Sequence, residues 1–183
     1  MRPGARLRRT YFECRYGQLH VLQAIPPGGG FDEATALLCI PGSRGVGRFF
    51  QNLLAPLGAN RSIYAPDLPG YGESDSAGTA AGDEQCALAF VDLLDSLRQR
   101  RVDVLAHAEG LGAAMALEKM RPGSLLRRCV FSAASRAQLA QARHLQLQFR
   151  ELTLALPGDE AITAESADLQ CADLIGIFGD KAP

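Results

Sequence analysis

Short apolar runs recur along this chain of 183 residues, and segments of helical periodicity separate them. The runs are residues 36–40, 62–65, 102–106, 129–131 and 174–178. They lack the polar alternation of a half-exposed strand, which is typical of strands buried on both faces. Strands of this kind that alternate with helices need right-handed crossover connections. The sequence therefore predicts the α/β class, with a mainly parallel, doubly wound sheet covered by helices on both faces.

The start of the chain follows a different pattern. Apolar and polar side chains alternate in residues 11–16 and 19–25, which meet at Gly17 and Gln18. A Pro-Pro-Gly-Gly-Gly segment at residues 26–30 ends the second run. These features predict an N-terminal antiparallel hairpin that precedes the parallel strands.

Helices are expected between the apolar runs, at residues 49–57, 83–98 and 110–120. Residues 136–156 are ambiguous, because their apolar side chains fit a helical stripe while residues 145–149 also alternate as a strand would. We favour a helix there, since the segment is rich in Leu, Gln, Arg, Glu and Ala.

The length of the chain and its hydrophobic content of 47% predict one globular domain, residues 1–183. The net charge of -1 offers no field that would gather nucleic acid or an anionic membrane. The arginines near the N-terminus are interpreted as solvating a loose end of the chain; they are Arg2, Arg6, Arg8 and Arg9. No apolar run approaches the roughly 20 residues of a membrane helix, and no signal peptide is recognisable. We therefore expect a soluble, cytoplasmic protein with its five cysteines reduced and no metal site.

Residues 102–114 are typical of a buried strand, a sharp turn and a helix of small residues. In the G-x-S-x-G nucleophile elbow, a serine stands at the apex of such a strained turn, where its oxygen faces the substrate. Ala108 holds the apex position here. Gly110 and Gly112 are expected to let the helix backbone approach the sheet closely.

Two further motifs precede this turn. Residues 65–75 read Ala-Pro-Asp-Leu-Pro-Gly-Tyr-Gly-Glu-Ser-Asp, and Pro41-Gly42-Ser43 follows an apolar run. Together with the turn, these motifs resemble the α/β-hydrolase family, in its esterase and lipase branch. Residues 65–75 are similar to the family's loop after the fourth strand, and Pro41-Gly42-Ser43 is similar to its oxyanion loop. The resemblance implies the family's fold with a short or absent cap at residues 136–172, and without its final strand and helix.

The resemblance also implies where a catalytic triad would stand, in the order serine, acid, histidine. Ala108 takes the place of the serine, and Ala182 takes the place of the acid, with Asp180 two positions away. No histidine follows the last apolar run. Triad hydrolysis is therefore not expected of the chain as it stands.

The resemblance also implies that the backbone amides which bind an anion in this family are still present. It implies that the backbone amides of Ser43 and Glu109 point at one spot above the turn. The other pocket candidates are Pro41, Gly42, His107 and Gly110. For the His107 side chain we favour packing over base catalysis. For the Glu109 side chain a structural role is favoured over a carboxylate nucleophile or base.

Three functions are consistent with these residues. The first is a non-catalytic homologue that binds a small carbonyl or carboxylate ligand, or a protein partner, without any cofactor. The second is a serine ester hydrolase with a substituted nucleophile, whose remaining parts lie beyond Pro183. The third is a nucleotide binder, because residues 42–49 nearly match G-x-x-x-x-G-K-[ST]; Arg48 and Phe49 replace the lysine and the hydroxyl residue, which disfavours it. An exposed apolar strand at 174–178 would also predict a homodimer through that edge.

Overall fold

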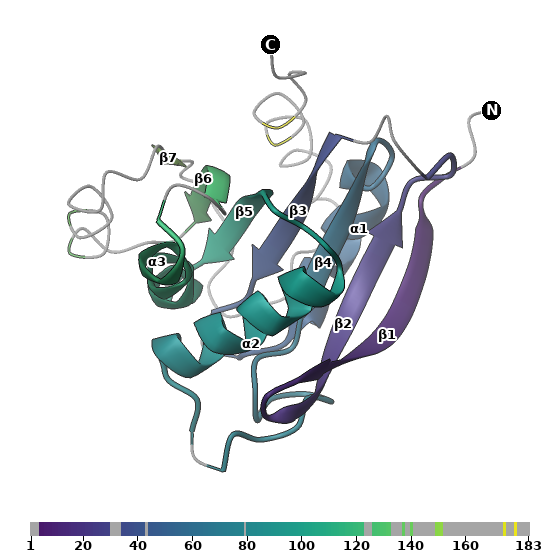
Figure 1. Ribbon diagram of the computed structural model, residues 1–183. Coiled ribbons are helices and arrows are strands. Elements are labelled where there is room, and N and C mark those ends of the chain that lie inside the picture. Colours follow the sequence, from purple (N-terminus) through teal and green to yellow (C-terminus); the bar gives the residue numbers. More distant parts are fainter. Residues whose placement is uncertain are drawn as a thin grey trace.

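The computed structural model describes residues 4–29, 34–42, 44–78, 80–122, 126–132 and 149–151, and the single residues 137, 140, 174 and 178. Its strands form one sheet in the order β1-β2-β4-β3-β5-β6-β7 (Figure 1). The strands are β1 Arg6–Cys14, β2 Gly17–Ile25, β3 Ala34–Ile40, β4 Arg61–Pro66, β5 Val102–His107, β6 Leu126–Ser132 and β7 Phe149–Glu151. Strand β2 pairs with β1 and β4 in antiparallel fashion, and the remaining pairs are parallel. The predicted parallel sheet with an N-terminal hairpin is confirmed.

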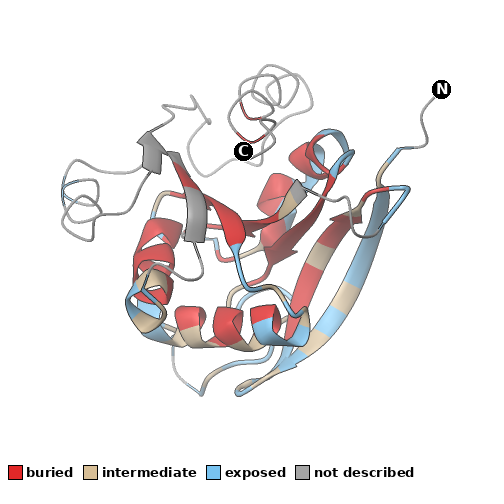
Figure 2. Cartoon of the chain, turned by 45° about the horizontal axis from the view of Figure 1, so that its top comes forward, coloured by how far each residue is buried: buried red, intermediate tan, exposed pale blue. Residues whose placement is uncertain are grey.

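Helices cover both faces of the sheet, as a doubly wound fold requires. They are the 3-10 helix η1 Gly47–Phe50, and α1 Gln51–Leu57, α2 Asp83–Ser96 and α3 Gly110–Met120. The buried side chains of α2 and α3 share one core cluster with β3 and β5, while η1 and α1 pack in a second cluster on the opposite face. Figure 2 shows the central strands buried and the hairpin strand β1 largely exposed.

Two predictions at the C-terminal side are wrong in the residues that the structure describes. Leu174 and Phe178 are helical and buried in the same cluster as α1, so they do not form an exposed edge strand. The homodimer predicted through a strand at 174–178 therefore has no support from these two residues. Residues 149–151, predicted as helix, form β7 and pair in parallel with β6. The error at 174–178 arises because the periodicity of a short apolar run does not distinguish a buried strand from a buried helix. The error at 149–151 arises because the side chains of residues 136–156 fit both a helical stripe and strand alternation.

The N-terminal arginines also differ from the prediction. Arg6, Arg8 and Arg9 belong to β1, which pairs with β2 along its whole length, and Arg2 lies outside the described residues. Arg9 contacts Glu73 at 3.3 Å, with both side chains exposed. Arg6, Arg8 and Arg9 are therefore exposed residues of a paired strand, with Arg9 on the opposite face of the strand from Arg6 and Arg8.

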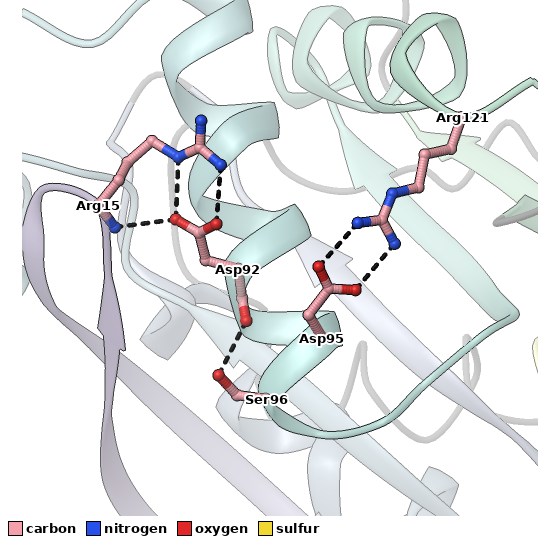
Figure 3. Close-up of polar contacts among 5 residues, drawn as sticks. All are labelled: Arg15, Asp92, Asp95, Ser96 and Arg121. Atoms are coloured by element: carbon pink, nitrogen blue, oxygen red, sulfur yellow. Dashed lines mark hydrogen bonds and ion pairs between the residues drawn. The ribbon is translucent and has the colours of Figure 1, made fainter.

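Ion pairs on the surface of α2 tie two other elements to it (Figure 3). Arg15, in the turn of the hairpin, donates through Nε and Nη2 to the Asp92 carboxylate at 2.9 and 2.8 Å. Arg121, just after α3, donates to Asp95 at 2.8 and 2.7 Å. Hydrogen bonds from these arginines lower the pKa of Asp92 and of Asp95.

A buried ion pair joins the starting ends of the parallel strands. The Arg61 guanidinium, on β4, lies 3.0 Å from the Asp103 carboxylate on β5, and both residues are fully shielded from solvent. Arg61 also donates to the carbonyl oxygens of Thr35 and Phe178, and its Cζ lies 5.5 Å from the centre of the Phe178 ring. The Arg61 side chain thus connects β3, β4 and β5 with residue 178.

Three chemical features follow from the part of the chain that the structure covers. None of its helices is long and apolar enough to cross a membrane. Its cysteines carry free thiols, and burial raises the pKa of Cys86 to about 11 and that of Cys129 to about 12. It contains no group of His, Cys, Asp and Glu side chains arranged to hold a metal ion.

Candidate functional site

The turn between β5 and α3 is the most strained backbone of the candidate site. Ala108 stands at its apex with φ of 46°, in the left-handed region that residues with a Cβ rarely adopt. This conformation costs an L-residue roughly 1–2 kcal/mol. The turn closes into the helix through the hydrogen bonds from Leu111 N to Ala108 O and from Gly112 N to Glu109 O, at 3.2 and 2.9 Å. The fold therefore keeps a sharp strand-to-helix turn with only a methyl group at its apex.

Gly110 lets α3 reach the sheet. A Cβ at this position would lie 2.6 Å from the carbonyl oxygen of Pro41 and 2.7 Å from that of Ile40, which is too close for any side chain. Gly112 has a different neighbour from the one expected, since the Asp83 carboxylate of α2 fills the space where its Cβ would stand. The close approach to the sheet thus depends on Gly110, and Gly112 serves the contact between the two helices.

The residues on both sides of the turn meet at Gly42. The point where a Cβ of Gly42 would stand lies 3.0 Å from Glu109 Oε2, 3.0 Å from His107 O and 3.2 Å from Ala108 Cβ. The structure therefore places Pro41, Gly42, His107, Glu109 and Gly110 close together, and a pocket lined by Pro41, Gly42, His107 and Gly110 stays a prediction. Ser43, Asp180 and Ala182 lie outside the described residues, and the amide pair of Ser43 and Glu109 stays a prediction.

The His107 imidazole lies beneath the turn in a packing arrangement. It is buried, and it stacks on the Phe49 ring with 4.5 Å between centroids and 26° between planes. Phe49 is itself 7% exposed. The position that would supply a hydroxyl to magnesium in a phosphate loop is therefore part of the core, which argues against the nucleotide-binding interpretation.

The segment after β3 is fixed from its other side by Asp67, at the end of β4. This buried carboxylate accepts hydrogen bonds from the amides of Gly47 and Glu73 at 2.7 and 3.0 Å. Its Oδ2 also lies 2.9 Å from His20 Nδ1 on β2. The contact of His20 with Asp67 was not predicted from the sequence. The signal for it was weak, a single polar residue between apolar neighbours in the second strand of the hairpin.

The loop that follows Asp67 adds an aromatic wall. The Tyr71 ring lies directly against Gly45, whose φ of 64° places it in the left-handed region. Gly45 N donates to Gly42 O at 2.8 Å, which closes a tight turn over residues 42–45. Tyr71 therefore lies against Gly45, at the end of this turn, and Glu109 lies close to Gly42, at its start.

A separate hollow of about 310 Å³ lies between α2 and α3. Asp83, Glu84, Met115, Lys119 and Met120 are among the side chains that line it. Burial raises the pKa of Asp83. None of residues 107–109 lines this hollow, so it is distinct from the site at the turn.

The sequence model of the Alpha/beta hydrolase family matches residues 37–179. The chain belongs to the alpha/beta hydrolase family. The match begins within β3 and includes the loop after β4 and the turn at Ala108, so it covers the candidate site apart from His20 on β2. No curated protein sequence matches the chain significantly.

Several solved structures share the fold at low sequence identity. The wild-type Cfl2 structure from Burkholderia cenocepacia superposes with a TM-score of 0.61 and 23% identity, over 70% of this chain and 42% of that one. The carboxylesterase CesB from Bacillus subtilis gives 0.59 and 18%, over 69% and 42%. The epoxide hydrolase CorEH gives 0.62 and 14%, over 94% and 56%. This alpha/beta hydrolase thus spans about half the length, or less, of the structures it resembles.

Proposed function

We propose that this protein binds a small carbonyl-bearing ligand at the turn after β5 without hydrolysing it. The observation that carries the proposal is the left-handed conformation of Ala108 between β5 and α3. A nucleophile elbow needs this strain to present an oxygen. Here the same strain presents a methyl group, so the turn is an elbow that has kept its shape without its nucleophile.

The chemistry of the turn supports binding rather than cleavage. Acyl transfer in this family needs an oxygen nucleophile, a histidine to accept its proton and an acid to orient the histidine. The Ala108 methyl group has no lone pair with which to attack a carbonyl carbon. Backbone amides need no particular side chain, and we assign the donors for a ligand oxygen to those of Glu109 and Ser43. A carbonyl or a carboxylate oxygen would satisfy such donors.

An ester hydrolase remains the second candidate, because several of the structural neighbours are esterases or epoxide hydrolases and the chain spans only part of their length. In that case the base and the acid would come from segments that this chain does not contain. The two candidates differ in one respect that is directly measurable, which is the presence of an activated oxygen.

Intact-protein mass spectrometry of the natively expressed protein, after exposure to a fluorophosphonate, separates the two candidates. We expect no adduct on the protein as it is. The Ala108→Ser variant is the matched control that restores an oxygen at the apex. An adduct on any serine of the unchanged protein would overturn the proposal and identify a nucleophile.

Binding is tested by NMR titration of ¹⁵N-labelled protein with hexanamide, a neutral carbonyl ligand. The amide resonances of Gly42 and Glu109 should shift in a saturable way, while that of Gly78, which has open space around it, should not. Absence of any shift at Gly42 and Glu109 would refute carbonyl binding at the turn.

We also propose that the protein resides in a reducing, cytoplasmic compartment. The free thiols of Cys39, Cys86 and Cys129 are buried, and disulfides are rare where the thiol pool is reduced. Thiol counting on the unfolded protein from its native cells should give five free groups, one for each cysteine in the sequence. A count of three or fewer would show a disulfide and an oxidising compartment.

A further inference from the structure

We propose that the hollow between α2 and α3 binds a small primary amine, with the ammonium group beside Asp83 and the apolar chain against the methionines of α3. None of residues 107–109 lines this hollow, so the inference goes beyond the proposed function and does not depend on it. The volume of about 310 Å³ lies within the range of roughly 300–1,000 Å³ that is usual for small-molecule pockets. The hollow is therefore large enough for a small ligand.

One face of α3 supplies the apolar wall of the hollow. The lining residues of this helix are Gly112, Met115, Ala116, Lys119 and Met120. Spacings of three and four residues place such side chains on one side of a helix. The thioether side chains of Met115 and Met120 are flexible and polarisable, so they adapt to apolar groups of different shape. The wall is therefore suited to a short hydrocarbon chain.

Asp83, in the first turn of α2, supplies an acceptor at the edge of this wall. Its carboxylate lies directly against Gly112 of α3, and burial raises its pKa. Among the residues that the structure describes, no hydrogen bond or ion pair reaches this carboxylate. Asp83 keeps exposed surface, so a ligand can contact it. An ammonium group would bring to it both a positive charge and three N–H donors.

The charges around the hollow favour a cation over an anion. Glu84 adds a second carboxylate to the lining, against the single ammonium group of Lys119. The charge of Lys119 lowers the pKa of Asp83, in opposition to burial, but the two side chains form no ion pair. The Cys86 thiol is neutral at physiological pH, because burial and the charge of Asp83 raise its pKa to about 11. The lining thus carries an excess of negative charge that a bound ammonium group would balance.

Two effects oppose cation binding, and both are weak. The start of α2 carries the positive end of a helix dipole, which is worth about 0.3–1 kcal/mol at an exposed site. Lys119 competes for Asp83, but its side chain is exposed and ends a flexible stem, so it can turn towards water when a ligand binds. The contact between Asp83 and Gly112 keeps the carboxylate at the wall of the hollow.

NMR titration with two ligands of equal length tests the proposal. Pentylammonium is positively charged at neutral pH, and 1-pentanol is uncharged. Both should shift the amide resonance of Gly112 and the methyl resonance of Met115 in a saturable way. The ammonium ligand should bind about three- to fivefold more tightly at low salt, as expected of a partly exposed ion pair. Added salt should reduce this difference.

The titration of Asp83 itself gives a second readout. The ¹³C resonance of its carboxyl group reports its pKa with and without saturating ligand. A cation bound beside a carboxylate lowers the pKa of that carboxylate. Pentylammonium should therefore move the titration towards acid, and 1-pentanol should not. A titration that pentylammonium leaves unchanged would show that the ammonium group does not lie beside Asp83.

Substitutions assign the preference to its source. Asp83→Asn keeps the shape of the side chain and should remove most of the preference for pentylammonium. Glu13→Gln is the matched control, because it removes an exposed carboxylate of β1 that does not line the hollow, and it should leave the preference unchanged. Lys119→Gln removes the competing cation and should strengthen pentylammonium binding about twofold. All three side chains are exposed, so the variants are expected to fold, which the dispersion of their NMR spectra verifies.

Three results would overturn the inference. They are the absence of a saturable shift at Gly112 and Met115 with pentylammonium, equal binding of the two ligands, and a preference that survives Asp83→Asn. Each of these results leaves carbonyl binding at the turn after β5 as it stands, because the hollow does not include residues 107–109.

Discussion

Each of the two ends of the parallel strands holds a buried pair that includes a carboxylate, and the two pairs have different roles. At the starting ends Arg61 faces Asp103, and at the carboxyl ends His20 faces Asp67. All four residues are at least 95% shielded from solvent. The comparison is informative because burial is equal at the two ends, and only the partners differ.

At the starting ends, the pair connects regular structure. Arg61 lies on β4 and Asp103 on β5, with β3 between these two strands, and the acceptors of Arg61 also include the backbone carbonyls of Thr35 and Phe178. The positive charge is balanced by a carboxylate and by dipoles. At this end of the molecule the buried pair therefore connects strands, and Arg98, which precedes β5, adopts a positive φ of 54° here.

At the carboxyl ends, the carboxylate of Asp67 receives two backbone amides from loops rather than a second full charge. Positive φ angles gather at the same end, at Gly45, Gly70, Gly72 and Ala108. In open parallel sheets the crevice at the carboxyl ends of the strands is where ligands bind. Arg61 and Asp103 thus connect strands at the starting ends, whereas Asp67 at the carboxyl ends holds the loops of a site with a strained backbone.

Breaking the pair at the starting ends should have the largest effect on stability. Arg61→Met leaves the Asp103 carboxylate buried opposite an apolar side chain, and loss of one partner of a buried pair costs about 3–5 kcal/mol. Urea unfolding measures this change. The double variant Arg61→Met with Asp103→Leu should recover most of the loss, since the charge is then gone from both sides. Equal destabilisation by the single and double variants would contradict the role assigned to the pair.

Removing Asp67 should cost less and act more locally. Asp67→Ala leaves the amides of Gly47 and Glu73 without their acceptor, and an unsatisfied buried donor costs about 1–3 kcal/mol. We expect a loss of about 2–3 kcal/mol, together with faster hydrogen exchange at Gly47 and Glu73 than at Val104 in the core. Asp67→Asn keeps one acceptor oxygen and should lose less. Unchanged exchange at Gly47 would show that Asp67 does not hold the loop.

The sequence predicts the regular part of the fold better than its C-terminal part. The apolar runs at 36–40, 62–65 and 102–106 correspond to β3, β4 and β5, because flanking turns and helices define their ends. The run at 174–178 has the same composition but provides helical residues, since its partners are α1 and Arg61 rather than a neighbouring strand. Local pattern alone carries no information about which surface will cover an apolar run.

The candidate site shows the same division. The strand, the sharp turn and the helix of residues 102–114 could be predicted, because their signals are contiguous in the sequence. The contact of Glu109 with Gly42 and that of His20 with Asp67 could not, since each joins side chains that are far apart along the chain. Such pairings depend on the order of strands in the sheet, which a single sequence leaves open.

The strain at Ala108 predicts a gain in stability on substitution by glycine. Glycine adopts a positive φ without the penalty that alanine meets, and this outweighs its larger conformational entropy in the unfolded chain. Ala108→Gly is expected to stabilise the protein by about 0.5–1 kcal/mol in urea unfolding. Ala116→Gly, inside α3, is the matched control and should destabilise it by about 1 kcal/mol. Destabilisation by both substitutions would show that the turn at Ala108 is not strained.

The smallest effect is expected at the surface pairs on α2, where charges face water as well as each other. Arg15 lowers the pKa of Asp92 in the folded protein, so the carboxylate contributes stability above its unfolded pKa of about 3.9 and loses it as the pH falls through the folded value. Asp92→Asn should therefore cost at most about 1 kcal/mol at pH 7, and its difference from the unchanged protein should shrink steadily towards acid. Asp95→Asn, whose carboxylate is more exposed, should show the same trend with a smaller amplitude. Urea unfolding between neutral and acid pH measures both curves. A difference at Asp92 that does not depend on pH would mean that α2 is held by packing alone, and that charge matters for this fold only where it is buried.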